Sequence, residues 1–345
     1  MSRTAVAGSF SARIVRWQGQ HGRHGLPWQA TKDPYRVWLS EVMLQQTQVS
    51  VVLDYYARFL QRFPDVAALA AAPLDDVLAL WSGLGYYSRA RNLHACARAV
   101  VALHAGAFPS TAETLATLPG IGRSTAAAIA AFCFGQRVAI LDGNVKRVLS
   151  RVLGFDGDLA KVGPLEQLWA SAQALLPRRA VDVYTQGLMD LGATVCTARK
   201  PACERCPVAA DCVARLQGEP ERYPVKSKKL KRSQREHALL WLQHGSRVWL
   251  VQRPDKGVWA GLWTFPEFPS TVALEAAVQA WPGQGDWLPT LQHALTHFDW
   301  TLHPLRWVLP ARAALHIELP PGRWFTVDDA LAAGLPAPIR RLLQS

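Results

Sequence analysis

Two acidic side chains, Glu41 and Asp142, stand in sequence settings that suit acid–base chemistry. Glu41 is surrounded by apolar residues, so a carboxyl group there would lose water and its pKa would rise. A carboxylic acid that keeps its proton near neutral pH can act as a general acid. The alternative is a glutamate on the solvated stripe of a helix, which is the commoner setting for a single helical Glu.

Asp142 precedes the helical pattern of residues 144–153 and has the position of an N-cap. The backbone amides that bond a capping carboxylate would lower its pKa and keep it charged. A fixed anion beside a cleft can stabilise a developing cation. The two carboxylates together therefore predict one proton donor and one permanent negative charge.

Four cysteines crowd into residues 196–212 with the spacing Cys-x6-Cys-x2-Cys-x5-Cys. Such crowding in an intracellular chain indicates a metal centre rather than a disulfide framework. Zinc is the general alternative, but zinc ribbons usually carry two Cys-x-x-Cys pairs. Only one such pair is present, which favours a four-cysteine iron–sulfur cluster. Cys96 and Cys133 lie in apolar helical patterns and are expected to be core residues.

The segment Leu118–Ala126 must connect two of the elements that position these groups. Ser110 and Glu113 have capping-box spacing and predict a short helix over residues 111–117. Residues 124–134 are rich in alanine and predict a buried helix.

Gly120 and Gly122 lie in the turn between these helices, where they allow positive φ and leave the backbone bare. The amides at the start of the second helix would then suit a phosphate. The pattern is typical of a helix-hairpin-helix that binds a DNA backbone without reading its sequence. An ordinary turn between two core helices explains it equally well.

Other helices follow from local signals. Residues 10–29 predict a helix and then a loop, in which Trp28 is a core residue or a stacking surface. Asp33 and Pro34 mark the start of a helix that is expected to run to Gln46 and on toward residue 63. Residues 65–104 predict two helices around a glycine-flexed loop that carries Tyr86, either a wedge for DNA or a packed turn. Residues 165–192 are also expected to be helical.

The periodicity changes after residue 236. Residues 238–242 and 247–253 predict two strands joined by a short turn, and a further strand pair is expected near residues 302–309. Helices are expected at 271–281 and 328–344. These elements predict a separate, small α+β domain.

The charge is unevenly distributed. The net charge is +12, yet residues 237–345 hold eight basic and eight acidic side chains, so the whole excess lies in residues 1–236. Residues 222–235 contain seven basic side chains and no acid, which is typical of a solvated linker along a phosphate backbone. This distribution favours a polyanionic partner, although a merely soluble basic protein would fit as well.

No targeting segment is expected. The start of the chain has no apolar signal-peptide run, and the longest unbroken apolar stretch, residues 126–134, is too short to cross a bilayer. We expect a soluble, cytoplasmic protein without a membrane partner.

The Leu-Pro-Gly-Ile-Gly run at 118–122, Asp142 and the cysteine spacing together resemble the endonuclease III superfamily of helix-hairpin-helix DNA glycosylases. Within it, segments 38–47, 83–91 and 141–148 resemble the adenine DNA glycosylases of the MutY type. The resemblance implies a mostly α helix-hairpin-helix glycosylase core with an iron–sulfur loop, and a C-terminal α+β Nudix-like domain.

The same resemblance implies four segments. They are an iron–sulfur cluster helical domain (1–29 plus 138–221), a six-helix domain with the helix-hairpin-helix (30–137), a basic linker (222–236) and a Nudix-like recognition domain (237–345).

The activity that the resemblance implies is hydrolysis of the N-glycosidic bond of adenine mispaired with 8-oxoguanine or guanine. The partner would be double-stranded DNA, bound by a monomer that flips the adenine out of the stack. Glu41 would protonate adenine N7, and Asp142 would stabilise an oxocarbenium-like transition state. The cofactor would be a [4Fe-4S] cluster held by Cys196, Cys203, Cys206 and Cys212.

Further site residues are carried over by position. The base pocket would contain Trp28, Leu44, Val49, Ser124 and Gln186; the DNA contacts would come from Gln46, Tyr86, Gly120, Gly122, Asn144 and Lys146; and the opposite base would be read by Leu295, Thr296 and His297.

Three departures from the family pattern qualify this assignment. Ser124 occupies the position where bifunctional relatives carry a lysine nucleophile, so a monofunctional enzyme is expected, although Lys146 is nearby and could react weakly. Leu295 replaces the aromatic residue of the usual Phe-Ser-His loop. The C-terminal domain lacks the acidic Arg-Glu-x-x-Glu-Glu run that Nudix hydrolysis requires.

Other functions compete with this one. A bifunctional pyrimidine glycosylase-lyase of the same fold is disfavoured by Ser124 and by the C-terminal domain. A DNA-binding protein without enzymatic activity is disfavoured because Glu41 and Asp142 are both present. A nucleotide-pyrophosphate hydrolase is disfavoured by the missing acidic run.

Overall fold

The computed structural model describes residues 3–227, 232–311 and 317–345. Lys228, Lys229 and Lys231 of the basic segment lie outside these ranges. The chain divides into two compact units, one of residues 1–56, 65–67 and 95–229, and the other of residues 57–64, 68–94 and 230–345. Within the described ranges, no helix combines the length and the apolar character needed to span a membrane.

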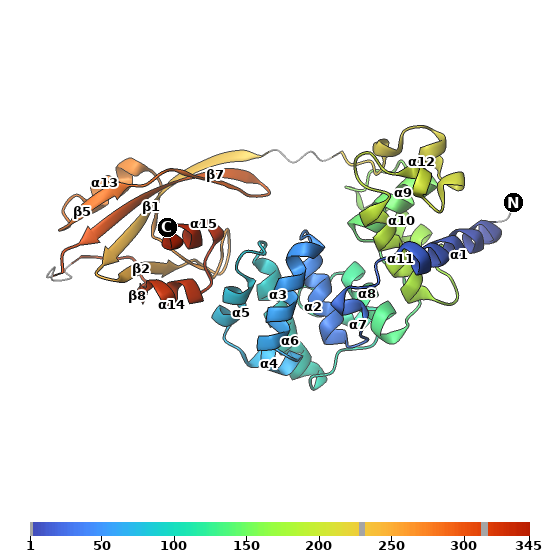
Figure 1. The fold of residues 1–345 in the computed structure, drawn as a ribbon, viewed down its shortest axis with the longest axis horizontal. Helices are drawn as coiled ribbons and strands as arrows, with labels where there is room; N and C mark the ends of the chain where they lie inside the picture. Colours follow the sequence, from blue (N-terminus) through green and yellow to red (C-terminus); the bar gives the residue numbers. More distant parts are fainter. Residues whose placement is uncertain (1–2, 228–231, 312–316) are drawn as a thin grey trace. The chain divides into compact units, whose positions relative to one another are not determined.

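Residues 3–227 form helices and connecting loops (Figure 1). The α-helices are α1 (Arg3–His21), α2 (Pro34–Leu44), α3 (Val49–Arg62), α4 (Val66–Ala71), α5 (Leu74–Trp81), α6 (Ser88–His104), α7 (Ala112–Leu115), α8 (Arg123–Phe134), α9 (Gly143–Leu153), α10 (Val162–Ala174), α11 (Val181–Thr194) and α12 (Val213–Leu216). Short 3-10 turns are η1 (Pro27–Gln29), η2 (Cys203–Arg205), η3 (Ala209–Asp211) and η4 (Pro220–Arg222).

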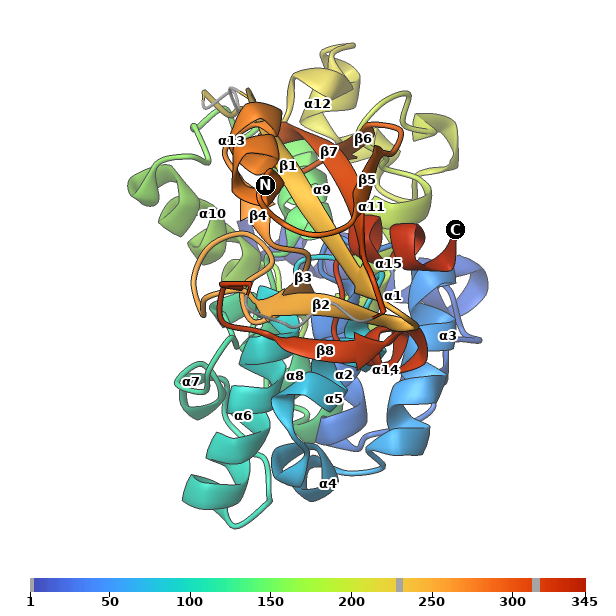
Figure 2. The same cartoon turned by 90° about the vertical axis from the view of Figure 1, so that its left-hand side faces the viewer.

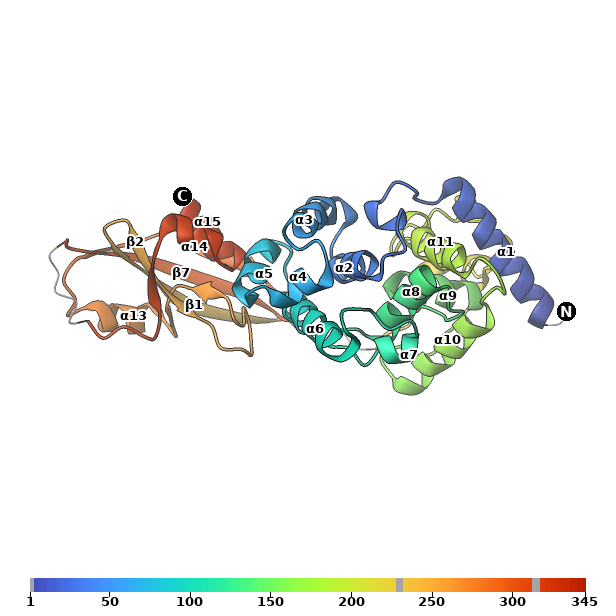
Figure 3. The ribbon, with the colours of Figure 1, turned by 90° about the horizontal axis from the view of Figure 1, so that it is seen from below.

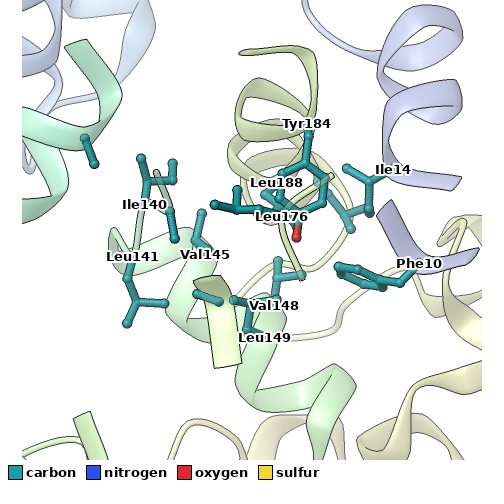
Figure 4. Packing of buried hydrophobic residues seen from close by; sticks show 14 of the residues in the cluster. Phe10, Ile14, Ile140, Leu141, Val145, Val148, Leu149, Leu176, Tyr184 and Leu188 are labelled. Atoms are coloured by element: carbon teal, nitrogen blue, oxygen red, sulfur yellow. The ribbon is translucent and has the colours of Figure 1, made fainter. Parts of the chain in front are cut away.

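The core of the first unit forms where α1, α9 and α11 meet. Phe10 and Ile14 of α1 point toward Tyr184 of α11, and the rings of Phe10 and Tyr184 make an edge contact at 6.3 Å (Figure 4). Val145 and Val148 of α9 are fully buried in the same cluster. Their spacing of three places both side chains on one face of a helix, and burial of that face holds the N-terminus of α9 in place.

Several helix boundaries differ from the prediction. The long helix after Asp33 breaks into α2 and α3, because Gln46 takes a left-handed backbone with φ +60. The N-cap of α7 is Thr111, whose hydroxyl accepts from the Thr114 amide at 3.3 Å, and not Ser110. Residues 165–192 are helical as predicted, in two helices, whereas residues 65–104 form three helices instead of two.

The second unit is built on one mixed sheet. Its elements are β1 (Ser233–His244), β2 (Arg247–Gln252), β3 (Trp263–Thr264), β4 (Glu267–Phe268), α13 (Thr271–Val278), β5 (Gln284–Trp287), β6 (Leu291–Ala294), β7 (Phe298–Leu309), β8 (Arg323–Thr326), α14 (Val327–Ala332) and α15 (Ala337–Gln344). The principal strand order is β3-β2-β1-β7-β5. β1 and β7 run parallel in register from Ser233↔Phe298 to His244↔Leu309 and lie side by side in Figure 2.

Both faces of this sheet are covered. α13 packs on one face, where Leu240 and Leu305 meet Leu274, and α14 and α15 lie against the other (Figure 3). The middle of β1 is therefore buried on both sides, as expected for the central strand of a doubly covered sheet.

Residues 68–94 belong to the same compact unit as the sheet. The hydroxyl groups of Ser82 and Tyr87 both donate to the Leu335 carbonyl, at 2.9 and 3.0 Å. A Cβ at Gly334 would lie 2.9 Å from Cβ of Leu78, so only glycine allows this close approach. The loop 82–87 is thus anchored on the C-terminal residues.

The predicted elements of residues 237–345 need four corrections. β1 begins at Ser233, inside the segment expected as a linker. Residues 302–309 belong to one long strand, β7, and the partners of the expected strand pair are β5 and β6, which precede it in the chain. The helix from residue 271 ends at Val278, and the helix expected over 328–344 is interrupted before α15. The turn joining β1 and β2 is confirmed by the pair His244↔Arg247.

Candidate active site and iron–sulfur centre

Glu41 lies near the C-terminal end of α2, and the N-cap Asp33 determines where this helix begins. Asp33 caps it as predicted, since its carboxylate accepts the Tyr35 amide at 2.9 Å. Val42 and Met43 are buried, which orients the helix and leaves Glu41 at the wall of a cavity of about 470 Å³. That volume is within the range of sites that take a small organic ligand.

Glu41 is half-buried, and the position of its carboxyl group at the cavity wall removes much of its contact with water. Burial, and secondarily the charge of Asp142, raise the pKa of Glu41 to about 7. This confirms the sequence-based expectation of a raised pKa. An acid with this pKa is about half protonated at neutral pH, which suits a proton donor.

Asp142 caps α9 as predicted, because its carboxylate accepts the Val145 amide at 2.7 Å. The predicted direction of its pKa was wrong. Burial raises the pKa of Asp142, and this effect outweighs the backbone amides of Val145 and Asn144 and the charges of Arg147 and Lys146, which lower it. The sequence shows the cap, but it does not show how deeply the cap is buried.

The residues predicted for the base pocket are only partly together. Trp28 and Gln186 line the cavity with Glu41. Leu44 and Val49 lie at the turn between α2 and α3 and are not among the described lining residues. Ser124 is also absent from the described lining, and its hydroxyl accepts the Leu141 amide at 3.2 Å, directly before Asp142.

Sequence reasoning identified only Trp28, Glu41 and Gln186 in the cavity wall and missed its other residues, among them Arg23 and Gln29. The amide nitrogen of Gln29 is buried and has no hydrogen-bond partner among the described residues. Neither residue forms a motif with its neighbours, so only the loop composition of residues 21–29 pointed to this region.

The helix-hairpin-helix is formed by α7, the turn 116–122 and α8. Ile121 is buried and anchors the turn, and Gly120 has φ +74. Gly122 differs from the prediction, since its φ is −82 and it is the extended N-cap residue of α8. Both glycines are exposed, so the amides at the start of α8 are accessible to a ligand.

Asn144 and Lys146 lie in the first turn of α9, beside Asp142. The side-chain oxygen of Asn144 accepts from Arg147 at 2.8 Å. Lys146 is half-buried, and desolvation is the main cause that lowers its pKa.

Gln46 is exposed in the turn between α2 and α3, and its φ is +60. A left-handed backbone is uncommon outside glycine and marks residues held by their surroundings. The neighbouring Gln45 donates to the Thr125 hydroxyl at 3.4 Å, which ties this turn to α8.

In the second unit, Tyr86 also has positive φ, +50, and its side chain is 42% exposed. The hydroxyl of Thr296 donates to the Tyr86 hydroxyl at 3.2 Å. Tyr86 and the predicted reading residues Leu295, Thr296 and His297 line one cavity of about 430 Å³. The structure thus brings together two segments that the sequence analysis assigned to separate DNA contacts.

All four cysteines, Cys196, Cys203, Cys206 and Cys212, line one small apolar pocket next to α9. Among the described residues, no three His, Cys, Asp or Glu side chains converge on a single-ion site. The all-thiol donor set in one pocket fits an iron–sulfur cluster, and the Arg151 guanidinium donates to Cys196 Sγ at 3.3 Å.

Comparison with known proteins decides the family. The adenine DNA glycosylase of Buchnera aphidicola subsp. Acyrthosiphon pisum is 34% identical, and the match covers 97% of this chain and 97% of that protein. This chain belongs to the adenine DNA glycosylase family. The adenine DNA glycosylase of Homo sapiens is also 34% identical, over 97% of this chain and 73% of the human protein.

Three family models match separate parts of the chain. They are the HhH-GPD superfamily base excision DNA repair protein (residues 39–171), the iron–sulfur binding domain of endonuclease III (196–212) and the NUDIX domain (237–345). The predicted fold class is confirmed. The chain is a DNA glycosylase of base excision repair, it binds DNA, and its cofactor is a [4Fe-4S] cluster.

Solved structures agree with the fold. A thermostable thymine-DNA glycosylase superposes with a TM-score of 0.56 at 28% identity, over 61% of this chain and 97% of that chain. Endonuclease III in a non-covalent DNA complex gives a TM-score of 0.54 at 20% identity, over 63% and 99%.

Proposed function

We propose that this chain is a monofunctional glycosylase that hydrolyses the N-glycosidic bond of adenine mispaired with 8-oxoguanine or guanine. One observation carries the proposal. Glu41, with a pKa of about 7, lies in the wall of a cavity of about 470 Å³, large enough to admit a base, and close enough to Asp142 to be affected by its charge. Membership of the adenine DNA glycosylase family supports the choice of base.

In the first step, the flipped adenine enters the cavity and Glu41 transfers its proton to N7. The C1′–N9 bond then breaks, and its electron pair passes to the base, which leaves as neutral adenine. Protonation is required because unprotonated adenine is a poor leaving group. A Glu41 that is neutral before the step and anionic after it performs this transfer.

In the second step, the positive charge on the deoxyribose ring is stabilised by the carboxylate of Asp142. Val145 supports the anion by donating its amide. Water adds to C1′, and the proton that it releases returns to the carboxylate of Glu41. The products are free adenine and an abasic site, and the enzyme is restored.

Monofunctional chemistry is supported by Ser124. Its hydroxyl is occupied by the Leu141 amide and carries no amine for a Schiff base. Lys146 is the nearby amine, and its lowered pKa would allow a weak side reaction.

The DNA contacts are proposed from exposure and backbone geometry. The amides that follow Gly120 and Gly122 would bind a phosphate, together with Asn144 and Lys146 at the start of α9. Gln46 and Tyr86, both exposed and both with positive φ, would enter the duplex. Thr296 and His297 would read the base opposite adenine, because 8-oxoguanine has a donor at N7 where guanine has an acceptor.

The functional segments that we propose are the cluster domain (1–29 plus 138–221), the six-helix domain (30–137), the linker (222–236) and the recognition domain (237–345). We also propose that the enzyme acts as a monomer in the cytoplasm. A four-thiol cluster site fits a reducing compartment.

The test is a single-turnover assay of base release from duplexes that carry adenine opposite 8-oxoguanine, guanine or thymine. We expect rapid adenine release opposite 8-oxoguanine, slower release opposite guanine, and no strand cleavage without added base. Release of a pyrimidine with cleavage would instead establish a glycosylase-lyase. Tight binding without release of any base would establish a DNA-binding protein.

A further inference from the structure

Asp190 of α11 is a fully buried carboxylate that the mechanism above does not use. Its oxygens accept three hydrogen bonds, two from Arg23 and one from Gln186. Arg23 donates its backbone amide at 3.0 Å and its guanidinium Nε at 2.7 Å, and Nη2 of the same guanidinium forms an ion pair with the carboxylate at 2.7 Å. Gln186 donates through Nε2 at 2.9 Å. A buried charge is stable only with such partners. Loss of any one of these contacts would therefore leave the Asp190 carboxylate poorly compensated.

Both partners of Asp190 line the cavity that contains Glu41. Arg23 belongs to the loop that leads into η1, and Gln186 lies one helical turn before Asp190. The Asp190 carboxylate therefore holds two side chains of the cavity wall, Arg23 from the loop and Gln186 from α11, in place.

The contact with Asp190 also fixes the orientation of the Gln186 amide. An ionised carboxylate only accepts hydrogen bonds, so the NH2 group of Gln186 must face Asp190. The carbonyl oxygen of the amide then remains for the cavity, and it has no hydrogen-bond partner among the described residues. The wall consequently presents an acceptor at this point.

An acceptor in the wall discriminates between purines of nearly equal size. Adenine has an exocyclic amine, which donates, whereas hypoxanthine has a carbonyl oxygen at the same place, which accepts. If the amide were free to turn over, its NH2 group could bond that oxygen equally well. The selectivity of such a site depends on what prevents the amide from turning.

We propose that Asp190 is the positioning residue that sets base selectivity, by holding the Gln186 amide with its oxygen toward the base. The site then accepts a 6-amino purine and rejects a 6-oxo purine. This inference rests on the proposed excision of adenine and extends it to the residue that enforces the choice.

The experiment compares single-turnover excision from duplexes with deoxyadenosine or deoxyinosine opposite 8-oxoguanine. In Asp190→Asn the side-chain amide can donate or accept, so the Gln186 amide is free to turn. We expect the adenine-to-hypoxanthine rate ratio to fall about tenfold, as for the loss of one good hydrogen-bond discrimination. Gln186→Met should give the same lowered ratio, and the double variant should lower it no further.

Two further variants separate selectivity from folding. Glu166→Gln is the matched control, since Glu166 also pairs with an arginine, Arg123 at 2.8 Å, but is not among the residues that line the cavity, and its ratio should stay at the wild-type value. Asp190→Asn combined with Arg23→Gln leaves no unpaired buried charge, and it should reach the same lowered ratio if the single variant folds poorly.

The outcomes distinguish the two proposals. If Asp190→Asn slows both substrates equally and the ratio is unchanged, Asp190 is structural only and the inference is overturned. If the wild-type chain releases no adenine from any duplex, the proposed function itself fails.

Discussion

The hydroxyl groups of Tyr86 and Thr296 lie 3.2 Å apart, although 210 positions separate the two residues in the chain. Tyr86 comes from the loop before α6, and Thr296 from the turn between β6 and β7. One residue proposed to enter the duplex is therefore joined to one proposed to read a base. This hydrogen bond holds the turn between β6 and β7 in a fixed position relative to Tyr86.

Replacing Thr296 with valine removes the hydroxyl and this hydrogen bond while keeping the shape of the side chain. We expect the preference for adenine opposite 8-oxoguanine over adenine opposite guanine to fall about tenfold. Excision opposite guanine should be unchanged. The measurement is the ratio of single-turnover rates for the two duplexes at matched salt.

Thr301→Val is the matched control for that experiment. Thr301 is on β7 of the same sheet and also uses its hydroxyl, toward Gln292 at 3.1 Å. An equal change in both variants would show that the effect comes from the sheet in general. Truncation is a poorer test, because the residues that follow Arg235 share a compact unit with residues 68–94.

The pH dependence of excision should follow Glu41. Its pKa of about 7 means that the protonated, active form is lost as the pH rises through 7. We expect the single-turnover rate to fall about tenfold per pH unit above pH 8. Glu41→Gln should bind the duplex and release no adenine at any pH.

The same variant has an expected effect on stability. The folded state raises the pKa of Glu41, so the charged form costs folding free energy above pH 7, and this cost disappears below the unfolded pKa of 4.5. Glu41→Gln should therefore raise the melting temperature at pH 8, with a gain that shrinks toward pH 5. A constant gain across this range would mean that Glu41 is not desolvated.

Asp142 has a capping role and a proposed chemical role, and two substitutions separate them. Asp142→Asn keeps an oxygen that can accept the Val145 amide, whereas Asp142→Ala does not. Both should lose excision, but only the alanine variant should lose about 1 kcal/mol of stability. Denaturant unfolding and base release measure the two effects, and near-normal excision by either variant would reduce Asp142 to a cap.

The cysteine loop presents three exposed cations, Arg199, Lys200 and Arg205. Replacing all three with serine should weaken binding to every duplex alike and make affinity less dependent on salt, because phosphate contacts carry no sequence information. Equilibrium binding over a range of salt concentrations is the measurement.

The control for this loop variant removes the same charge elsewhere, by serine at Arg16, Arg98 and Lys161, all of which are exposed. This control should leave the salt slope closer to that of the wild type. A change in mismatch preference in the loop variant would show instead that the loop reads bases.

Ser124→Lys places an amine at the second residue of α8. We expect weak strand nicking and a borohydride-trapped adduct, with adenine excision retained. Lack of any adduct in a variant that still excises adenine would show that the site excludes attack by an amine. Lys146→Ala in the same background removes the other nearby amine.

The features that could be predicted from the sequence are those that depend on interactions between residues close together in the chain. The caps at Asp33 and Asp142 and the raised pKa of Glu41 follow from a few neighbouring residues and were confirmed. The cysteine spacing likewise identified the cluster, because its ligands lie within one short segment.

What the sequence could not show depends on contacts between distant residues. No glycine or proline in the sequence marks the helix break at Gln46. A positive φ is predicted for Gly122, but as the N-cap residue of α8 it has a negative φ that any residue can adopt. The direction of the Asp142 pKa depends on burial by several helices. The role of Asp190 depends on Arg23, which lies 167 positions away.

The packing of Leu78 against Gly334 also determines when the second unit can form during synthesis. Val77, Leu78 and Trp81 give α5 an apolar face that is buried in the finished fold. The residues that complete this unit leave the ribosome about 250 positions later. At an elongation rate of about 5–20 residues per second this is a delay of roughly ten to fifty seconds. Trp81 can already pack on Phe59, 22 positions earlier in the chain, but throughout that interval Leu78 lacks the C-terminal residues that cover it, so this part of the nascent helix is accessible to chaperones.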